Sequence, residues 1–211
     1  MLPLIDTSSH VYKRPEKCIQ EGHHVSTFLT SFAYRDIGLF VTQLNRAMCP
    51  RVIEDSSRVQ TWELNSSHGF DTSLGLVPKI RDMLANIQNI IKDAPPDTGP
   101  RRFGNIAFRK WHSILEEQCD SLLSACLPES FYAVNSDSTA SAVDELKAYL
   151  LGSFGSAERL DYGTGHELSF LAFLGCIWKL GGFSDSAHEG DGVIERSIVV
   201  GIIELWVLIN S

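Results

Sequence analysis

Long apolar runs at the helical period constrain this chain more than any other sequence feature. Residues 25–48 carry an apolar side chain at nearly every third or fourth position, and residues 76–91 repeat the pattern up to Ala94-Pro95-Pro96. This spacing is typical of an α-helix with one apolar face, and proline ends the second run because it lacks an amide hydrogen. We expect one helix of about six turns over 25–48 and another over 76–91.

Three later segments extend the same pattern. Residues 107–123 and 142–154 are amphipathic, whereas residues 166–180 are apolar nearly all round, which is typical of a helix in the middle of a bundle. Gly181-Gly182 follows and can turn the chain left-handed, so the helix should end there. Alternating strand patterns are scarce. The sequence therefore predicts an all-α fold.

Charge, cysteine usage and the start of the chain narrow the partners and the compartment. The formal net charge of -8 repels phosphate backbones and anionic membranes, so we expect no nucleic acid and no membrane partner. Five cysteines without a C-x-x-C pair indicate free thiols in a reducing compartment. Since the start resembles no signal peptide, we expect a cytoplasmic protein and leave nuclear entry open.

The segment 159–167 reads RLDYGTGHE and places two glycines around a threonine directly before the most apolar helix. Backbone amides at such a junction can face an anion, and Arg159 can grip a phosphate through two donors. A nucleotide phosphate is one interpretation. The alternative is structural: Thr164 and Glu167 have the spacing of a capping box.

A second segment, residues 101–111, reads RRFGNIAFRKW and follows a proline-rich linker. Its aromatic side chains could wall an apolar groove. Alternatively, Phe108 and Trp111 lie three apart on a helix and belong to the core, while Arg101 and Arg102 are solvated. Periodicity alone leaves both interpretations open.

Other chemistry has weaker support in the sequence. His166 beside Glu167 could be half of an acid/base pair, while Asp36 has the position of a solvated helical charge. Seven histidines show no zinc spacing, and no G-x-S-x-G, Walker or dinucleotide motif occurs. These absences give no support to common hydrolase, P-loop or dehydrogenase functions.

Together, the segments 102–111 and 159–167 resemble the phosphotyrosyl phosphatase activator family, the activators of type 2A protein phosphatases. The stretch 160–174 with the preceding GSFG at 152–155 is similar to that family's most recognisable block, and residues 33–37 look like its N-terminal helix. The resemblance spans residues 15–204, which we expect to form the activator domain, while residues 205–211 diverge.

The resemblance implies a helical fold with core, linker and lid, a prolyl cis/trans isomerase activity, and ATP- and Mg2+-dependent activation of the phosphatase catalytic subunit. A proline-containing peptide is the implied substrate. By position, Arg159, Thr164 and Gly165 match family residues that contact ATP. The other candidate residues of the two motifs are Arg102, Phe103, Gly104, Asn105, Trp111, Asp161, Tyr162, Gly163, His166 and Glu167.

The family's continuation, which carries a Gly-Val-Trp-Gly-Leu-Asp-Asp motif with magnesium ligands and part of the peptide groove, is not found after Glu204. We therefore expect a C-terminally truncated member without its magnesium ligands. Seven apolar side chains in residues 193–209 are more than a terminal helix can leave in water, so we expect part of this surface to be exposed; they are Ile194, Ile198, Val199, Ile202, Ile203, Trp206 and Ile209. Two alternatives to an isomerase stay open: a non-catalytic module that binds phosphatase or nucleotide, and an inactive fragment.

Overall fold

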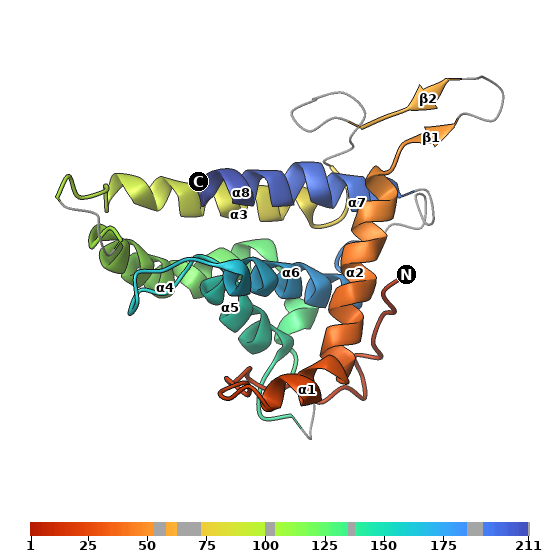
Figure 1. Cartoon of the computed structure of the whole chain (residues 1–211), viewed down its shortest axis with the longest axis horizontal. Coiled ribbons are helices and arrows are strands. Elements are labelled where there is room, and N and C mark those ends of the chain that lie inside the picture. The colour runs from red at the N-terminus through yellow and green to blue at the C-terminus, as the bar shows by residue number, and fades with distance from the viewer. Residues whose placement is uncertain (53–57, 63–72, 100–103, 135–137, 185–191, 211) are drawn as a thin grey trace.

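The structure, a computed structural model, describes residues 1–52, 58–62, 73–99, 104–134, 138–184 and 192–210 and is mostly helical (Figure 1). Its elements in order are α1 (His24–Leu29), α2 (Phe32–Met48), β1 (Arg51–Val52), β2 (Val59–Gln60), α3 (Val77–Asn89), η1 (Ile90–Lys92), α4 (Ala107–Cys126), η2 (Glu129–Tyr132), α5 (Ala142–Gly152), α6 (Thr164–Lys179), α7 (Val193–Ile198), η3 (Val199–Ile203) and α8 (Glu204–Ile209). In the described part of the chain the strands are limited to one short antiparallel pair. The predicted all-α fold is confirmed, whereas its division into core, linker and lid stays a prediction.

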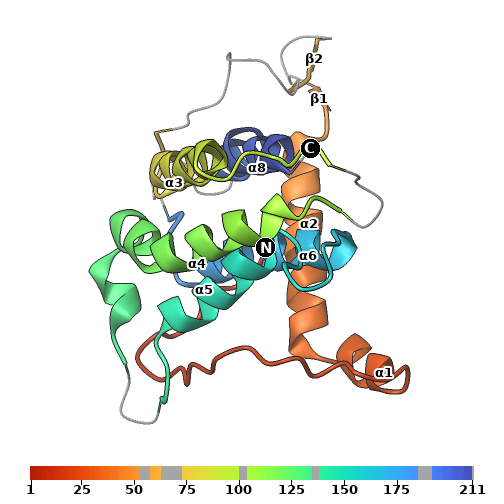
Figure 2. The same ribbon diagram turned by 90° about the vertical axis from the view of Figure 1, so that its left-hand side faces the viewer.

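The helices pack in two layers, and one further helix crosses both layers at one end of the molecule. The run α7–η3–α8 lies beside α3 in one layer, while α4, α5 and α6 form the other, and both views show this arrangement (Figures 1 and 2). Helix α2 crosses the ends of both layers and packs against α6 and α7. The two layers enclose the apolar core.

Local sequence signals explain where the helices begin and end. Ser141 and Asp144 form a reciprocal capping box at the start of α5. Gly181 takes a left-handed φ of 77° after α6, as its lack of a side chain allows. The helices predicted over 76–91, 107–123, 142–154 and 166–180 are all present, within a few residues of the expected bounds.

The prediction of a single helix over 25–48 is wrong, because the helix is interrupted between α1 and α2. Ser31 adopts an extended conformation there, and its Oγ accepts a hydrogen bond from the Tyr34 amide at 3.2 Å. Serine favours this N-cap role over a helix interior, since its side chain replaces the missing backbone acceptor. The apolar period continues across the break and therefore hides it.

The prediction that Asp36 is a solvated helical charge is also wrong. Its side chain is buried and accepts hydrogen bonds from Arg35 Nε at 2.9 Å and from Lys179 Nζ at 2.5 Å. Burial opposes the charge on this carboxylate, but the hydrogen bonds from Lys179 and Arg35 outweigh burial and lower its pKa. Asp36 thus ties α2 to the end of α6.

The exposure expected for part of residues 193–209 is limited to Val207 and Leu208, and none of the seven side chains that suggested it is exposed. Ile194, Ile198, Ile202 and Trp206 are all buried, because the run packs between α2 and α3 and against α6. The Trp206 ring stacks on Phe170 with centroids 4.4 Å apart. At its outer side Val207 and Leu208 remain exposed, so most of this apolar surface is part of the core.

Among the described residues, no helix combines the length and the apolar character that crossing a bilayer requires.

Candidate functional site

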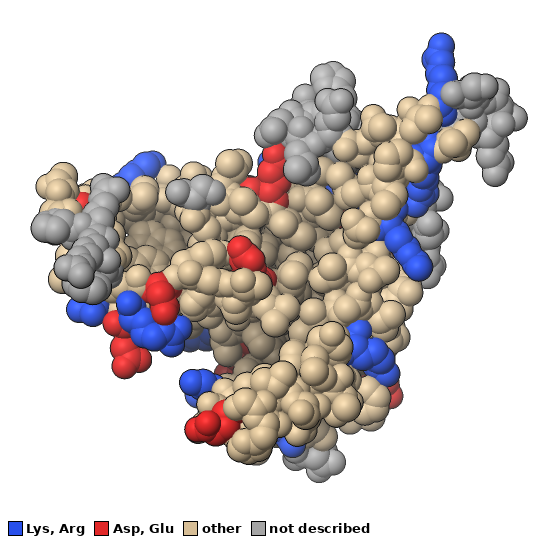
Figure 3. Space-filling view, in the orientation of Figure 1, with Lys and Arg blue, Asp and Glu red and all other residues tan. Residues whose placement is uncertain are grey.

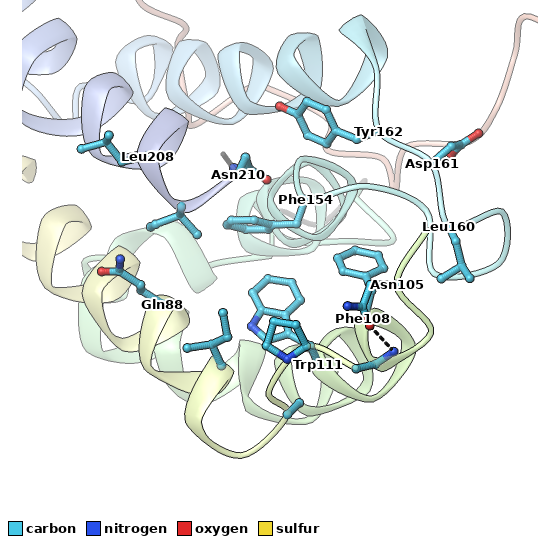
Figure 4. Close-up of a pocket in the computed structure, with 15 residues that line it drawn as sticks. Gln88, Asn105, Phe108, Trp111, Phe154, Leu160, Asp161, Tyr162, Leu208 and Asn210 are labelled. Atoms are coloured by element: carbon cyan, nitrogen blue, oxygen red, sulfur yellow. Dashed lines mark hydrogen bonds between the residues drawn. The ribbon is translucent and has the colours of Figure 1, made fainter. Parts of the chain in front are cut away.

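A pocket of about 530 Å³ opens where the two layers separate at one end of the molecule, and the recess between the layers is walled mainly by uncharged side chains (Figures 3 and 4). We call it the aromatic pocket. It is lined by Gln88, Ile91, Ala94, Pro96, Asn105, Ala107, Phe108, Trp111, Phe154, Leu160, Asp161, Tyr162, Leu208, Ile209 and Asn210. These residues come from α3 and η1, the linker between η1 and α4, the start of α4, the loop after α5, and the end of α8 with the residue that follows it.

Three aromatic rings form the base of this pocket. Phe108 and Trp111 stack with centroids 5.6 Å apart, and the Phe154 ring meets Trp111 edge-on at 5.4 Å. Trp111 and Phe154 are buried, whereas Phe108 is half-buried. For Phe108 and Trp111 the two interpretations are therefore compatible, since the same rings pack with the core and line the pocket.

Asn105 and Gly104 join the first motif to its surroundings. Asn105 Oδ1 accepts from the amides of Asp97 and Ala107, both at 3.0 Å, so it holds the proline-rich linker against the start of α4. Gly104 has a φ of +85°, and a Cβ there would lie 2.5 Å from the Leu160 carbonyl oxygen. Glycine is thus required where the two motif segments touch. Arg101, Arg102 and Phe103 lie outside the described residues.

The loop from Gly155 to Asp161 carries the first half of the second motif and is folded tightly on itself. The Ser156 amide donates to the Asp161 carbonyl at 3.0 Å, and the Leu160 amide donates to the Ser156 carbonyl at 2.7 Å. Leu160 adopts a left-handed φ of 54°, which costs a non-glycine residue about 1 kcal/mol. Contacts elsewhere must hold this strained conformation in place.

Arg159 and Asp161 stand on this loop as an exposed pair. Arg159 Nε donates to Asp161 Oδ2 at 2.7 Å. This hydrogen bond, opposed by a small desolvation, lowers the pKa of the Asp161 carboxyl. The pair links the aromatic pocket, which Asp161 lines, to a second hollow that Arg159 lines.

The second hollow, of about 470 Å³, lies on the other side of the loop, and we call it the polar hollow. Its titratable lining side chains are Arg109, His112, Glu116, Glu158, Arg159 and His166. His166 Nδ1 lies 2.6 Å from the Gly152 carbonyl, which can only accept, so the proton resides on Nδ1. The His166 ring also stacks on Tyr162, with centroids 5.6 Å apart. Among the described residues, no hydrogen bond or ion pair joins the His166 ring to the Glu167 carboxylate, as the predicted acid/base pair would require.

Helix α6 begins beside the polar hollow without a side-chain cap. Gly163 occupies the N-cap position, and Thr164 is already the first helical residue, so the predicted capping box of Thr164 and Glu167 is wrong. Extended backbone at Gly163 places the cap one residue earlier than the sequence spacing suggests. Cβ atoms at Gly163 or Gly165 would meet nothing within 4 Å. Packing therefore does not explain these glycines, and open space adjoins the first amides of the helix, where anions bind.

The structure brings most of the predicted residues to these two places. Asn105, Trp111, Asp161 and Tyr162 line the aromatic pocket, while Arg159 and His166 line the polar hollow. The remaining described candidates lie at the motif junction or, exposed, around the start of α6; they are Gly104, Gly163, Thr164, Gly165 and Glu167.

Several lining residues had no predicted role. Phe154 lies in the GSFG block, and its membership of that block was the available signal. Arg109, Leu208 on α8 and Asn210 directly after α8 gave none, because their contacts connect segments far apart in the sequence. In the described part of the chain, no three histidine, cysteine or acidic side chains form a group that could hold a metal ion.

Comparisons with known proteins agree with this architecture. A family model described as phosphotyrosyl phosphate activator (PTPA) protein matches residues 15–209. The serine/threonine-protein phosphatase 2A activator 1 of Aspergillus fumigatus is 49% identical over 207 residues, covering 97% of this chain and 42% of the relative. Its namesake in Emericella nidulans is 48% identical, covering 97% of this chain and 46% of the relative.

A solved structure matches over the whole fold. The crystal structure of the PP2A phosphatase activator Ypa1 superposes with a TM-score of 0.76 at 27% identity, covering 100% of this chain and 59% of that one. The chain thus spans less than half the length of these two curated relatives. Because the family model matches residues 15–209 and the Aspergillus fumigatus relative is 49% identical over 97% of the chain, the chain belongs to the phosphotyrosyl phosphatase activator family.

Proposed function

We propose that this chain takes part in activating type 2A protein phosphatases, by isomerising a proline-containing peptide in the aromatic pocket with ATP held at the polar hollow. The relatives are named as activators of phosphatase 2A. The observation that carries the proposal is the meeting of the two motif segments around a pocket with four aromatic rings in its lining, beside a hollow that contains Arg159. The partner in this proposal is the phosphatase catalytic subunit, and the location is cytoplasmic.

The aromatic pocket suits a proline-containing peptide. Its described lining contains no lysine or arginine and one carboxylate, Asp161. Stacked rings such as Phe108 and Trp111 offer a flat apolar surface to a pyrrolidine ring, and the amides of Gln88 and Asn210 lie at the edge (Figure 4). Apolar walls with a few polar groups are typical of ligand pockets.

Prolyl isomerisation needs no nucleophile, because no covalent bond is broken. The barrier of roughly 18 to 20 kcal/mol arises from amide resonance, which is lost as the bond twists. A pocket that excludes water disfavours the polar planar amide relative to the twisted one, and complementarity to the twisted state adds to this effect. Phe108, Trp111 and Phe154 provide such surroundings.

The residues at the polar hollow fit a nucleotide phosphate. Arg159 supplies an exposed guanidinium, and the uncapped start of α6 supplies the amides of Thr164 and Gly165 beside open space. In this proposal Arg159 binds phosphate oxygens and the α6 amides orient them. Bound ATP would supply its charged phosphate chain to the contact with the phosphatase. We assign no described residue to Mg2+.

The test of this function follows cis/trans exchange of a proline peptide by NMR with the purified chain. The wild-type protein should accelerate exchange, and Phe108→Ala should reduce the acceleration at least about tenfold, as expected for loss of a pocket wall. Phe32→Ala is the matched control, since Phe32 is 76% exposed on α2 and does not line the pocket. Peptide binding without acceleration would identify a non-catalytic binding module instead. Neither binding nor acceleration, by a chain that melts cooperatively, would indicate an inactive fragment.

Association with the phosphatase is tested separately. Purified type 2A catalytic subunit should be retained by the immobilised chain, and more strongly when ATP is added. Equal retention by the chain and by an unrelated acidic protein would contradict this part of the proposal.

A further inference from the structure

Arg109 stands outside every role assigned above, yet it reaches from α4 to the loop that carries Arg159. Its Nε donates to the Ala157 carbonyl at 3.1 Å, and a terminal nitrogen donates to the Glu158 carbonyl at 3.3 Å. The two carbonyls belong to the residues directly before Arg159. A planar guanidinium with donors on adjacent nitrogens suits two neighbouring acceptors.

The backbone conformation of the loop from Gly155 to Asp161 requires support from neighbouring residues. Gly155 has a φ of 114° and Leu160 a φ of 54°. Both ends of the loop therefore have positive φ angles, which residues with a side chain rarely adopt. The internal bonds of the loop join the backbone of Ser156 to that of Leu160 and Asp161, and the Arg159 amide donates to Ser156 Oγ at 3.1 Å. None of them engages the carbonyls of residues 157 and 158. The carbonyls at 157 and 158 turn instead toward α4, where Arg109 meets them.

We propose that Arg109 is a positioning residue, which fixes the loop so that Arg159 lies at the polar hollow and Asp161 lies at the rim of the aromatic pocket. Phe108, next to Arg109, would lie 3.3 Å from a Cβ at Gly155, so adjacent residues of α4 brace the loop from both the aromatic and the polar side. The consequence for nucleotide binding rests on the proposed function. The consequence for the loop itself does not.

The matched variants are Arg109→Gln, Arg109→Lys and Lys110→Gln. Glutamine removes the forked donors, and lysine keeps the charge but offers one donor group in place of two. Lys110 is the control, because it also donates from α4 to a backbone carbonyl, that of Asp93 at 2.7 Å, but not to the loop.

Hydrogen exchange of the free protein tests the positioning directly. Arg109→Gln should speed amide exchange in residues 156–162 roughly tenfold, while Arg109→Lys gives a smaller increase and Lys110→Gln none there. Exchange in the buried part of α6 should be unchanged in all three variants. Unaltered exchange in 156–162 of Arg109→Gln would overturn the proposal whether or not ATP binds.

ATP titration by calorimetry tests the link to Arg159. Arg109→Gln should weaken ATP roughly tenfold, Lys110→Gln should not, and the double variant Arg109→Gln/Arg159→Ala should bind no more weakly than Arg159→Ala alone. Additive losses in the double variant would overturn the claim that Arg109 acts through Arg159. If the wild-type chain binds no ATP, the nucleotide part of the proposed function fails, and the exchange result alone decides the role of Arg109.

Discussion

The aromatic pocket and the polar hollow lie on opposite sides of one loop but are built in different ways. The walls of the pocket are rings such as Trp111 and Phe154 that are also part of the core. The charged side chains of the hollow, Arg109, Glu116, Glu158 and Arg159, are exposed, and the nearby Gly163 and Gly165 have open space around them. The difference implies that changes in the pocket reduce stability together with binding, whereas changes at the hollow reduce binding while stability is kept.

Trp111→Ala should have the largest effect. Removing this buried ring deletes contacts with both Phe108 and Phe154, and large-to-small changes of this kind cost about 3–5 kcal/mol of unfolding free energy. Urea denaturation measures the loss, with Trp111→Phe as the control that should cost clearly less. A loss below about 1 kcal/mol would show that the pocket wall is not part of the core.

Gly104→Ala and Gly163→Ala contrast the junction of the motifs with the open start of α6. Alanine at Gly104 must adopt a positive φ and displaces the Leu160 carbonyl, so we expect a loss of about 1–3 kcal/mol. Alanine at Gly163 meets no atom, and its extended backbone suits any residue, so stability should stay within about 0.5 kcal/mol. Thermal melting of both variants checks the order, and equal losses would break the comparison.

Gly165→Ala separates stability from binding within one residue. Gly165 lies in the first turn of α6, where alanine is the better helix former, so stability should be unchanged or higher by up to about 1 kcal/mol. If phosphate occupies the space beside it, the added methyl group should weaken ATP roughly tenfold, which is about 1.4 kcal/mol. Calorimetry on the variant measures this. An unchanged affinity would remove Gly165 from the nucleotide site.

The ion pair of Arg159 and Asp161 should give the smallest stability effect. The folded pKa of Asp161 is lowered, so its contribution is present above the unfolded pKa of the carboxyl and is lost as pH falls through the folded pKa. Because the pair is exposed, solvent keeps this contribution small. Arg159→Ala should return the Asp161 pKa toward its ordinary value in an NMR titration, and an unmoved pKa would assign the shift to another cause.

Helices were predictable from the sequence because apolar side chains on one helix face recur every three or four residues. Ser31 escaped prediction, since the period of 25–48 continues across a break that a single hydroxyl group stabilises. The capping box at Thr164 failed for a related reason: Gly163 can take the extended N-cap conformation, which places Thr164 inside the helix. Local spacing therefore predicts that a helix exists more reliably than it predicts the residue at which the helix begins.

Contacts between distant segments were not predictable in the same way. Asp36 pairs with Lys179, and Trp206 stacks on Phe170, but neither partner is marked by a pattern in the chain. The two motif segments were identified by resemblance, yet the bond from Arg109 to the loop before Arg159 required the packing of α4 against the chain after α5. Tertiary structure therefore adds the division of the site into a pocket and a hollow.

The most direct test of this division is an NMR titration of the isotope-labelled wild-type chain with ATP. We expect shifts of the Arg159, Thr164, Gly165 and His166 amides, with the Trp111 indole N–H and the Gln88 side-chain amide in the aromatic pocket unmoved. Shifts that instead concentrate on Trp111 and Gln88 would place the nucleotide in the aromatic pocket and contradict the account.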